Sequence, residues 1–288
     1  MSTEHHRKTA RAMWHLLEPI HAVTYFSEEV TAAYKAVELK GFWQGYFASR
    51  VAPMGPVSGE VCGAVFYNFQ PEMVQRALPS AWAAAPPDAV LRARDEALQP
   101  VLSTMFGDDD TIAEAADLAT IAIEGCGLQG RALFAGHASL PRPDDPVLRL
   151  WWAATLLREH RGDGHVATLL AHGVDGLEAH VLFVGTGRVP RELMQAARSW
   201  SDEEWAAAER RLQLRGLAGP DGLTDEGAAL RGRIEEVTDD LATGPWHRLG
   251  EERTERLAHL LTPLRDRVLQ TGRIPFFKPI GLPIAELG

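Results

Sequence analysis

The residues best suited to chemistry in this chain are concentrated at 158–165, REHRGDGH, just after an apolar stretch that begins at Trp151. The ionisable members are Arg158, Glu159, His160, Arg161, Asp163 and His165. Buried charges are costly unless they are paired, so core packing alone does not account for this cluster. Gly162 and Gly164 predict a break where the backbone can turn. The segment is therefore predicted either to seal a junction between two structural units or to line a binding pocket.

A second pair, Glu18 and His21, has the E-x-x-H spacing that places both side chains on one helical face. Helix bundles use this spacing to hold iron or manganese when facing helices supply further ligands. Those ligands would be Glu159, His160, Asp163 or His165. The chain contains only one such pair, and Pro19 disturbs the helix between its members. A hydrogen-bonded ion-pair network explains the same residues more simply, and we predict no metal and no cofactor.

Aromatic residues gather in the first half of the chain and again at Trp151 and Trp152. Aromatic residues at helical spacing usually form core, but a core that also holds histidine and arginine resembles an apolar pocket with a few convergent polar groups. We predict a small, partly apolar ligand whose polar or acidic end lies against the ionisable cluster. The predicted ligand-binding residues are His21, Tyr25, Trp43, Tyr46, Arg50, Glu159, His160, Arg161 and His165. We further expect His21 to share one cavity with His160 or His165.

Composition narrows the class of protein. The chain has 288 residues, a formal net charge of −10 and two cysteines, Cys62 and Cys126. Neither a signal-peptide core nor an apolar run of about 20 residues occurs, so a cytoplasmic protein without a membrane partner is expected. Dinucleotide, P-loop, zinc-protease and serine-hydrolase motifs are absent. An enzyme, or a metal- or cofactor-binding protein, that uses the pocket containing His21, His160 and His165 stays open as the alternative function, with the winged helix only structural.

Periodicity predicts a mainly all-α fold in three parts. Residues 1–145 are predicted to form a helical domain that ends in the linker LPRPDDP, and residues 146–243 a central helix followed by a winged-helix-like domain. Residues 244–288 are predicted to form a helical extension with an apolar tail. Leucines at helical spacing in that extension, with the tail IPFFKPIGLPI, predict a homodimer.

Two resemblances bear on the winged-helix prediction. Residues 215–217, Arg-Gly-Leu, followed by a loop and by LTDEG at 223–227, resemble the end of the recognition helix and the wing of MarR-type regulators. Over most of the chain, EPIHAVTYF at 18–26, GFWQGYFASRVAPMGPV at 41–57, REHRGDGHVA at 158–167 and GPWHRLG at 244–250 are similar to an actinobacterial family of helix-turn-helix proteins. The resemblance implies an architecture but not an activity.

DNA binding by this segment is possible but electrostatically disfavoured. Between residues 186 and 241 the chain has eight basic and twelve acidic residues. Asp202, Glu203 and Glu204 begin the predicted recognition helix, and Asp221 is predicted at the wing tip. The candidate phosphate contacts are Arg188, Arg191 and Arg198. The functional prediction is a ligand-sensing, transcription-regulator-like protein, and a winged helix kept only for packing or dimerisation is a further alternative.

Overall fold

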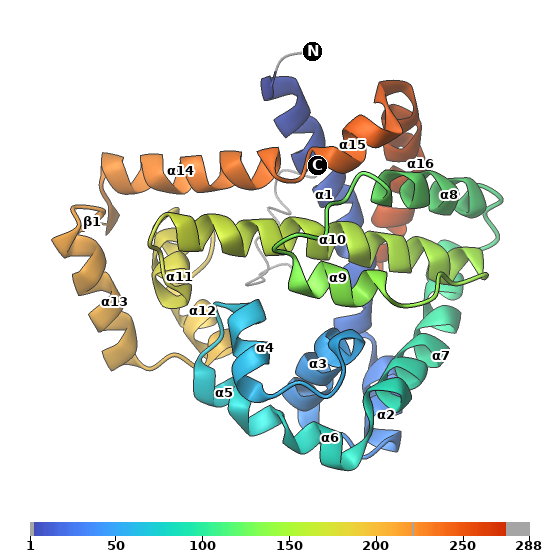
Figure 1. Cartoon of the computed structure of the whole chain (residues 1–288), viewed down its shortest axis with the longest axis horizontal. Coiled ribbons are helices and arrows are strands. Elements are labelled where there is room, and N and C mark those ends of the chain that lie inside the picture. The colour runs from blue at the N-terminus through green and yellow to red at the C-terminus, as the bar shows by residue number, and fades with distance from the viewer. Residues whose placement is uncertain (1–2, 221, 275–288) are drawn as a thin grey trace.

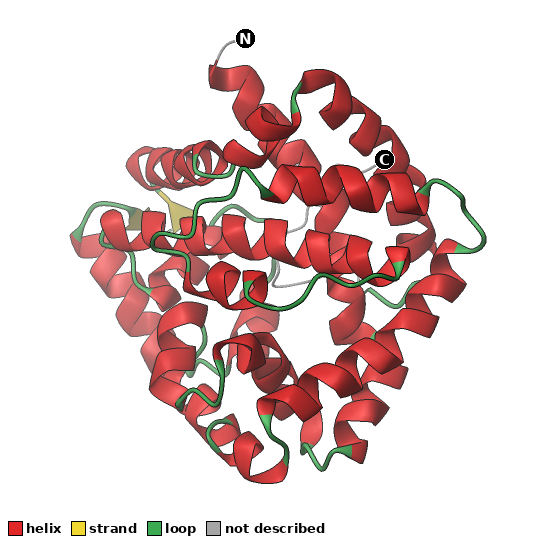
Figure 2. Ribbon diagram, turned by 45° about the vertical axis from the view of Figure 1, so that its right-hand side comes forward, coloured by secondary structure: helices red, strands yellow, loops and turns green. Residues whose placement is uncertain are grey.

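The computed structural model describes residues 3–220 and 222–274, and helices dominate them (Figure 2). The prediction of a mainly all-α fold is confirmed. The first part comprises α1 (Thr3–Phe26), α2 (Glu28–Ala36), α3 (Gly41–Val51), the 3₁₀ turn η1 (Ala52–Met54), α4 (Gly59–Phe66), α5 (Pro71–Ala77), α6 (Ser80–Ala84), α7 (Pro87–Phe106), α8 (Ile112–Ile123) and α9 (Ala132–Ala138).

The central element is α10 (Pro146–Ala171), which spans the middle of the molecule (Figure 1). Pro146 suits the first helical turn, and the Asp145 side chain accepts a hydrogen bond from the Leu148 N–H at 2.9 Å. The helix passes through Gly162 and Gly164 without interruption, so the predicted break at 158–165 is wrong.

Packing explains the glycine at position 164, although an interior glycine costs a helix about 1 kcal/mol relative to alanine. The guanidinium of Arg131 donates a hydrogen bond to the backbone carbonyl of His160. A Cβ on Gly164 would lie 2.8 Å from Nη1 of Arg131 and would displace it. Gly164 therefore provides room for a neighbouring side chain within a continuous helix.

The second part follows α10. It comprises α11 (Gly176–Val184), α12 (Arg191–Arg198), α13 (Asp202–Leu214), the strands β1 (Ala218–Gly219) and β2 (Gly222–Leu223), α14 (Asp225–Asp240), α15 (Gly244–Leu249) and α16 (Glu251–Gln270). The predicted capping box at the start of α13 is present, since Ser201 and Glu204 exchange side chain–backbone hydrogen bonds. The two strands pair antiparallel, with Ala218 opposite Leu223. Asp221 lies outside the described residues.

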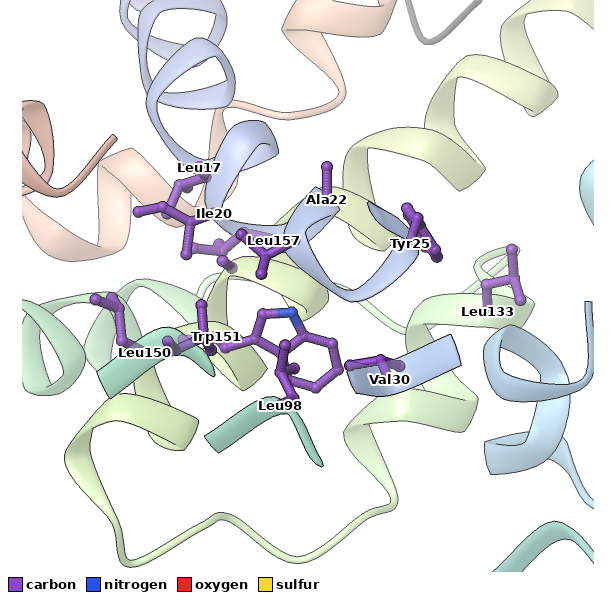
Figure 3. Packing of buried hydrophobic residues seen from close by; sticks show 14 of the residues in the cluster. Leu17, Ile20, Ala22, Tyr25, Val30, Leu98, Leu133, Leu150, Trp151 and Leu157 are labelled. Atoms are coloured by element: carbon purple, nitrogen blue, oxygen red, sulfur yellow. The ribbon is translucent and has the colours of Figure 1, made fainter. Parts of the chain in front are cut away.

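Two hydrophobic clusters form the core. The larger one joins the helices from α1 to the first half of α10 with α15 and α16, and Trp151 lies near its centre among Leu98, Val30 and Leu157 (Figure 3). The smaller one joins the end of α10 to α11–α14 around Trp205. Because α10 contributes to both clusters, it positions them relative to one another.

The C-terminal helices pack on their own chain. Leu257, Leu261 and Leu264 are completely buried, and α16 contacts α1, α7 and α8. The apolar stripe that suggested self-association is thus already covered, which removes that argument for a dimer. The predicted apolar tail IPFFKPIGLPI lies outside the described residues except for its first residue, Ile274, which is buried. Within residues 3–220 and 222–274, no helix combines the length and the apolar character needed to cross a membrane.

Candidate functional site

A cavity of about 490 Å³ lies where the two hydrophobic clusters meet. Its wall is built from Trp14 and Glu18 of α1, from α3 and α4, from the middle of α10, and from α11, α12 and α14. Five predicted ligand-binding residues lie in this wall: Tyr46, Arg50, Glu159, Arg161 and His165. The ionisable part of α10 therefore faces a cavity, as the pocket interpretation expects.

One side of the wall carries a buried ion-pair network around Glu159. Arg50 Nη2 donates to both carboxylate oxygens of Glu159 at 3.0 Å, with side chains that are 8% and 1% exposed. Arg158 bridges Glu159, at 2.9 Å, and Glu18, at 3.3 Å. Burial alone would raise the pKa of Glu159, but the guanidiniums of Arg158 and Arg50 outweigh it and hold that pKa far below its usual range. Glu159 is therefore a fixed negative charge.

A second ion-pair network joins α10, α1 and α14. Arg161 donates to Asp239 at 2.6 Å, and Arg11 donates to Asp239 at 2.9 Å and to Glu235 at 2.6 Å. Arg231 also pairs with Glu235. Burial opposes ionisation of Glu235, but Arg231, with smaller contributions from its other neighbours, keeps the pKa of this carboxyl lowered. These pairs attach the long helix α14 to α1 and α10.

His21 does not line the cavity, contrary to the prediction. Its Nδ1 lies 2.9 Å from Thr155 Oγ1 and its Nε2 lies 2.8 Å from the Tyr25 hydroxyl, so both ring nitrogens are used inside the core. Burial, with a smaller effect of Arg158, holds the pKa of His21 well below its usual value. The ring is neutral and supports the packing of α1 against α10. Glu18 accepts hydrogen bonds from Trp14 and Arg158, so the E-x-x-H pair is fully used within the protein.

Three further predicted residues also lie elsewhere. The His160 ring packs edge-on against Phe134, with centroids 5.2 Å apart, on another side of α10. Tyr25 and Trp43 belong to the aromatic core around Tyr46. The continuous helix is the reason, because it sends His160 and His165 to different sides, whereas a turn would have let them converge. His165 remains in the wall, with its Nδ1 2.9 Å from Thr238 Oγ1.

Arg198 has a different position from the one predicted. It was expected at a DNA phosphate, but it is only 6% exposed and lines the cavity, with its guanidinium carbon 4.3 Å from the centre of the Phe69 ring. Burial lowers the pKa of Arg198 to about 10. One signal in the sequence was compatible with this position: Arg198 ends a segment, 191–198, whose polar and apolar residues separate onto two helix faces.

The segment predicted as a helix-turn-helix comprises α12, the turn at Ser199 and α13. Ser199 adopts a left-handed backbone conformation, with φ 59°, which lets α13 change direction. Arg191 donates to Asp202 at 3.2 Å and lies over the Trp205 ring, and Arg188 lies exposed at the cavity wall. Arg210, which was not predicted, is exposed on α13. Of the three arginines proposed for phosphates, Arg198 is therefore excluded by its burial.

Metal binding and thiol reactivity are two further kinds of chemistry that the residues of this chain raise. No group of three or more His, Cys, Asp or Glu residues in the described part of the chain could hold a metal ion. Burial raises the pKa of both the Cys62 and the Cys126 thiol to about 12, so neither is a ready nucleophile.

The comparisons with known proteins agree with this architecture. The model of a helix-turn-helix family matches residues 10–275. The chain therefore belongs to this helix-turn-helix family. Belonging to this family supports a DNA-binding, regulator-like role in general terms. Neither a curated protein nor a solved structure matches the chain.

Proposed function

We propose that this protein is a DNA-binding regulator whose helix-turn-helix responds to a small, partly apolar molecule bound in the cavity. The observation that carries the proposal is the position of Arg198. It is the last residue of α12, the first helix of the helix-turn-helix, and its side chain forms part of the cavity wall. A ligand that moves this side chain acts directly on the segment that orients α13.

The loop after α4 provides a second link. The backbone carbonyl of Asn68 lies 2.9 Å from His180 Nε2 of α11 and accepts a hydrogen bond from Trp200 Nε1 at 3.3 Å. The backbone carbonyl of Arg198 accepts a hydrogen bond from the Gln70 N–H at 3.3 Å. Asn68 and Phe69 of this same loop line the cavity. The loop therefore connects the cavity to α11 and to the turn between α12 and α13.

The order α11, α12, α13, β1, β2 supports a MarR-like winged helix, with α13 as the recognition helix. Arg210 and Gln213 are exposed on α13 and are the side chains we propose for DNA contact. Asp202 and Glu203 are exposed at the N-terminal end of the same helix and would face phosphates unfavourably. We therefore expect weak, steeply salt-dependent binding.

Fluorescence anisotropy with a labelled random-sequence duplex at low salt tests the DNA-binding part. The double variant Asp202→Asn/Glu203→Gln should bind at least about fivefold more tightly than the wild type, because two repulsive charges are removed. Glu204 is left unchanged because it completes the capping box. The matched control, Glu252→Gln/Glu255→Gln, changes the same charge at exposed positions of α16.

If both double variants change the affinity for the duplex equally, the effect comes from the net charge of the protein alone, and α13 does not approach the DNA. If neither variant nor wild type binds any duplex, the DNA-binding proposal fails.

A further inference from the structure

The cavity wall and the whole chain differ in the sign of their charge. Among the described residues, seven arginines and three glutamates line the cavity, in a protein whose formal net charge is −10. Exposed charges are weakened by water and salt, whereas charges in a partly closed cavity act through a lower effective dielectric constant. The wall therefore favours a ligand of negative charge.

We propose that the cavity binds an organic anion whose charged group lies beside Arg198 and Arg50 and whose apolar body packs on Phe66 and Phe69. This inference rests on the proposed function, because it names the chemical class of ligand for the same cavity.

The aromatic rings hold the two guanidiniums in place. The guanidinium carbon of Arg50 lies 4.3 Å from the centre of the Phe66 ring, and that of Arg198 lies 4.3 Å from the centre of the Phe69 ring. The two rings are themselves only 5.9 Å apart. Cations stacked on aromatic faces keep a fixed orientation. The site thus presents two preorganised cations above one apolar surface.

One buried donor of Arg50 lacks a partner among the described residues. Its Nη1 donates to the Tyr46 hydroxyl and its Nη2 to Glu159, but its buried Nε has no hydrogen-bond partner among the described residues. A buried donor without a partner is costly, and a charged acceptor satisfies it best. A ligand carboxylate or sulfonate would supply such an acceptor if the guanidinium turned its Nε toward the cavity.

The arginines also repel one another. Besides the larger effect of burial, the positive charges of Arg50 and Arg158 contribute to the lowered pKa of Arg198. A bound anion would offset this repulsion, whereas a neutral ligand of the same shape would not. The aromatic surface formed by Phe66 and Phe69 in turn favours an organic anion over inorganic phosphate, which has no apolar body.

Two fluorescent probes that share one ring system test the inference on the full chain. They are 8-anilinonaphthalene-1-sulfonate, an anion, and N-phenyl-1-naphthylamine, its neutral counterpart. The wild type should bind the anionic probe at least about tenfold more tightly than the neutral one, because a charge-assisted hydrogen bond forms only with the anion. In Arg198→Met the preference should fall to about threefold or less, since the apolar surface persists while one cation is lost.

Arg233→Met is the matched control, because Arg233 is exposed on α14 and does not line the cavity. It should keep the full preference. Equal affinity of the wild type for both probes would overturn the anion inference and leave a ligand-binding cavity in place. Absence of binding by either probe would overturn this inference together with the ligand part of the proposed function. Should Arg198→Met fail to fold, the probe comparison in the wild type still decides the matter.

Discussion

The substitution Glu159→Gln tests whether the buried network in the cavity wall is as tightly coupled as its geometry indicates. Glutamine keeps the shape of the side chain but removes the negative charge that Arg50 and Arg158 share. Arg50 would lose its only carboxylate partner among the described residues, and Arg158 would keep only Glu18, at 3.3 Å.

The magnitude follows from burial. Removing one partner of a buried ion pair costs about 3–5 kcal/mol, because the other charge stays buried without compensation. Arg50 has only 8% of its side chain exposed, so it cannot turn to solvent. Glutamine still offers one oxygen as a hydrogen-bond acceptor, which places our expectation at the lower end, about 3 kcal/mol. That is a large fraction of the roughly 5–15 kcal/mol by which domains are stable.

Equilibrium urea unfolding followed by circular dichroism at neutral pH measures the effect. The control is Glu124→Gln, which breaks an ion pair with Arg248 whose side chains are 53% and 55% exposed. Surface pairs contribute about 0–1 kcal/mol, so the control should lose at most about 1 kcal/mol. Equal losses for the two variants would refute the view that Glu159 is the centre of a buried network.

Three further predictions follow from single contacts. A Cβ on Gly176 would lie 2.1 Å from the Tyr67 carbonyl oxygen, so Gly176→Ala should lower the free energy of unfolding in urea by about 3 kcal/mol or more. Gly63→Ala is the control, because nothing lies within 4 Å of a Cβ there, and it should lose none. Equal stability of the two variants would contradict the close packing at Gly176. Burial lowers the pKa of His180 in the folded protein to about 3, so below about pH 6.5 only the unfolded chain gains a proton and the free energy of unfolding falls. His180→Gln should remove about 1 kcal/mol per pH unit of this fall between about pH 6 and pH 4. An unchanged slope of unfolding free energy against pH would contradict this assignment. Arg210→Ala should weaken DNA binding and reduce the salt slope by about 1, and an unaltered slope would remove Arg210 from the interface.

The sequence sufficed for the helical class, because apolar residues recur at helical spacing and the Ser201 capping box marks a helix start that the structure contains. It also placed the ionisable cluster at a cavity through Arg161 and His165. It failed where distant residues decide the local geometry. Gly164 lies inside a continuous helix, and the guanidinium of Arg131, far away in the chain, occupies the space that a Cβ would need there.

The orientation of individual side chains was likewise beyond sequence patterns. A break at 158–165 would have directed His160 toward His21, but a continuous helix sends it to Phe134. Arginine is usually exposed, so the pattern indicated a surface role for Arg198. Only the packing of α12 against the Phe69 loop shows that this guanidinium lies inside.

The central claim is that the cavity and the helix-turn-helix are coupled, and one measurement addresses it directly. The affinity of the full chain for a labelled duplex is measured by anisotropy at low salt, with and without saturating 8-anilinonaphthalene-1-sulfonate. We predict that the probe changes the DNA affinity of the wild type at least about fivefold, within the usual range of allosteric coupling, and that of Arg198→Met less than about twofold. An unchanged DNA affinity in wild-type protein that has demonstrably bound the probe would contradict it.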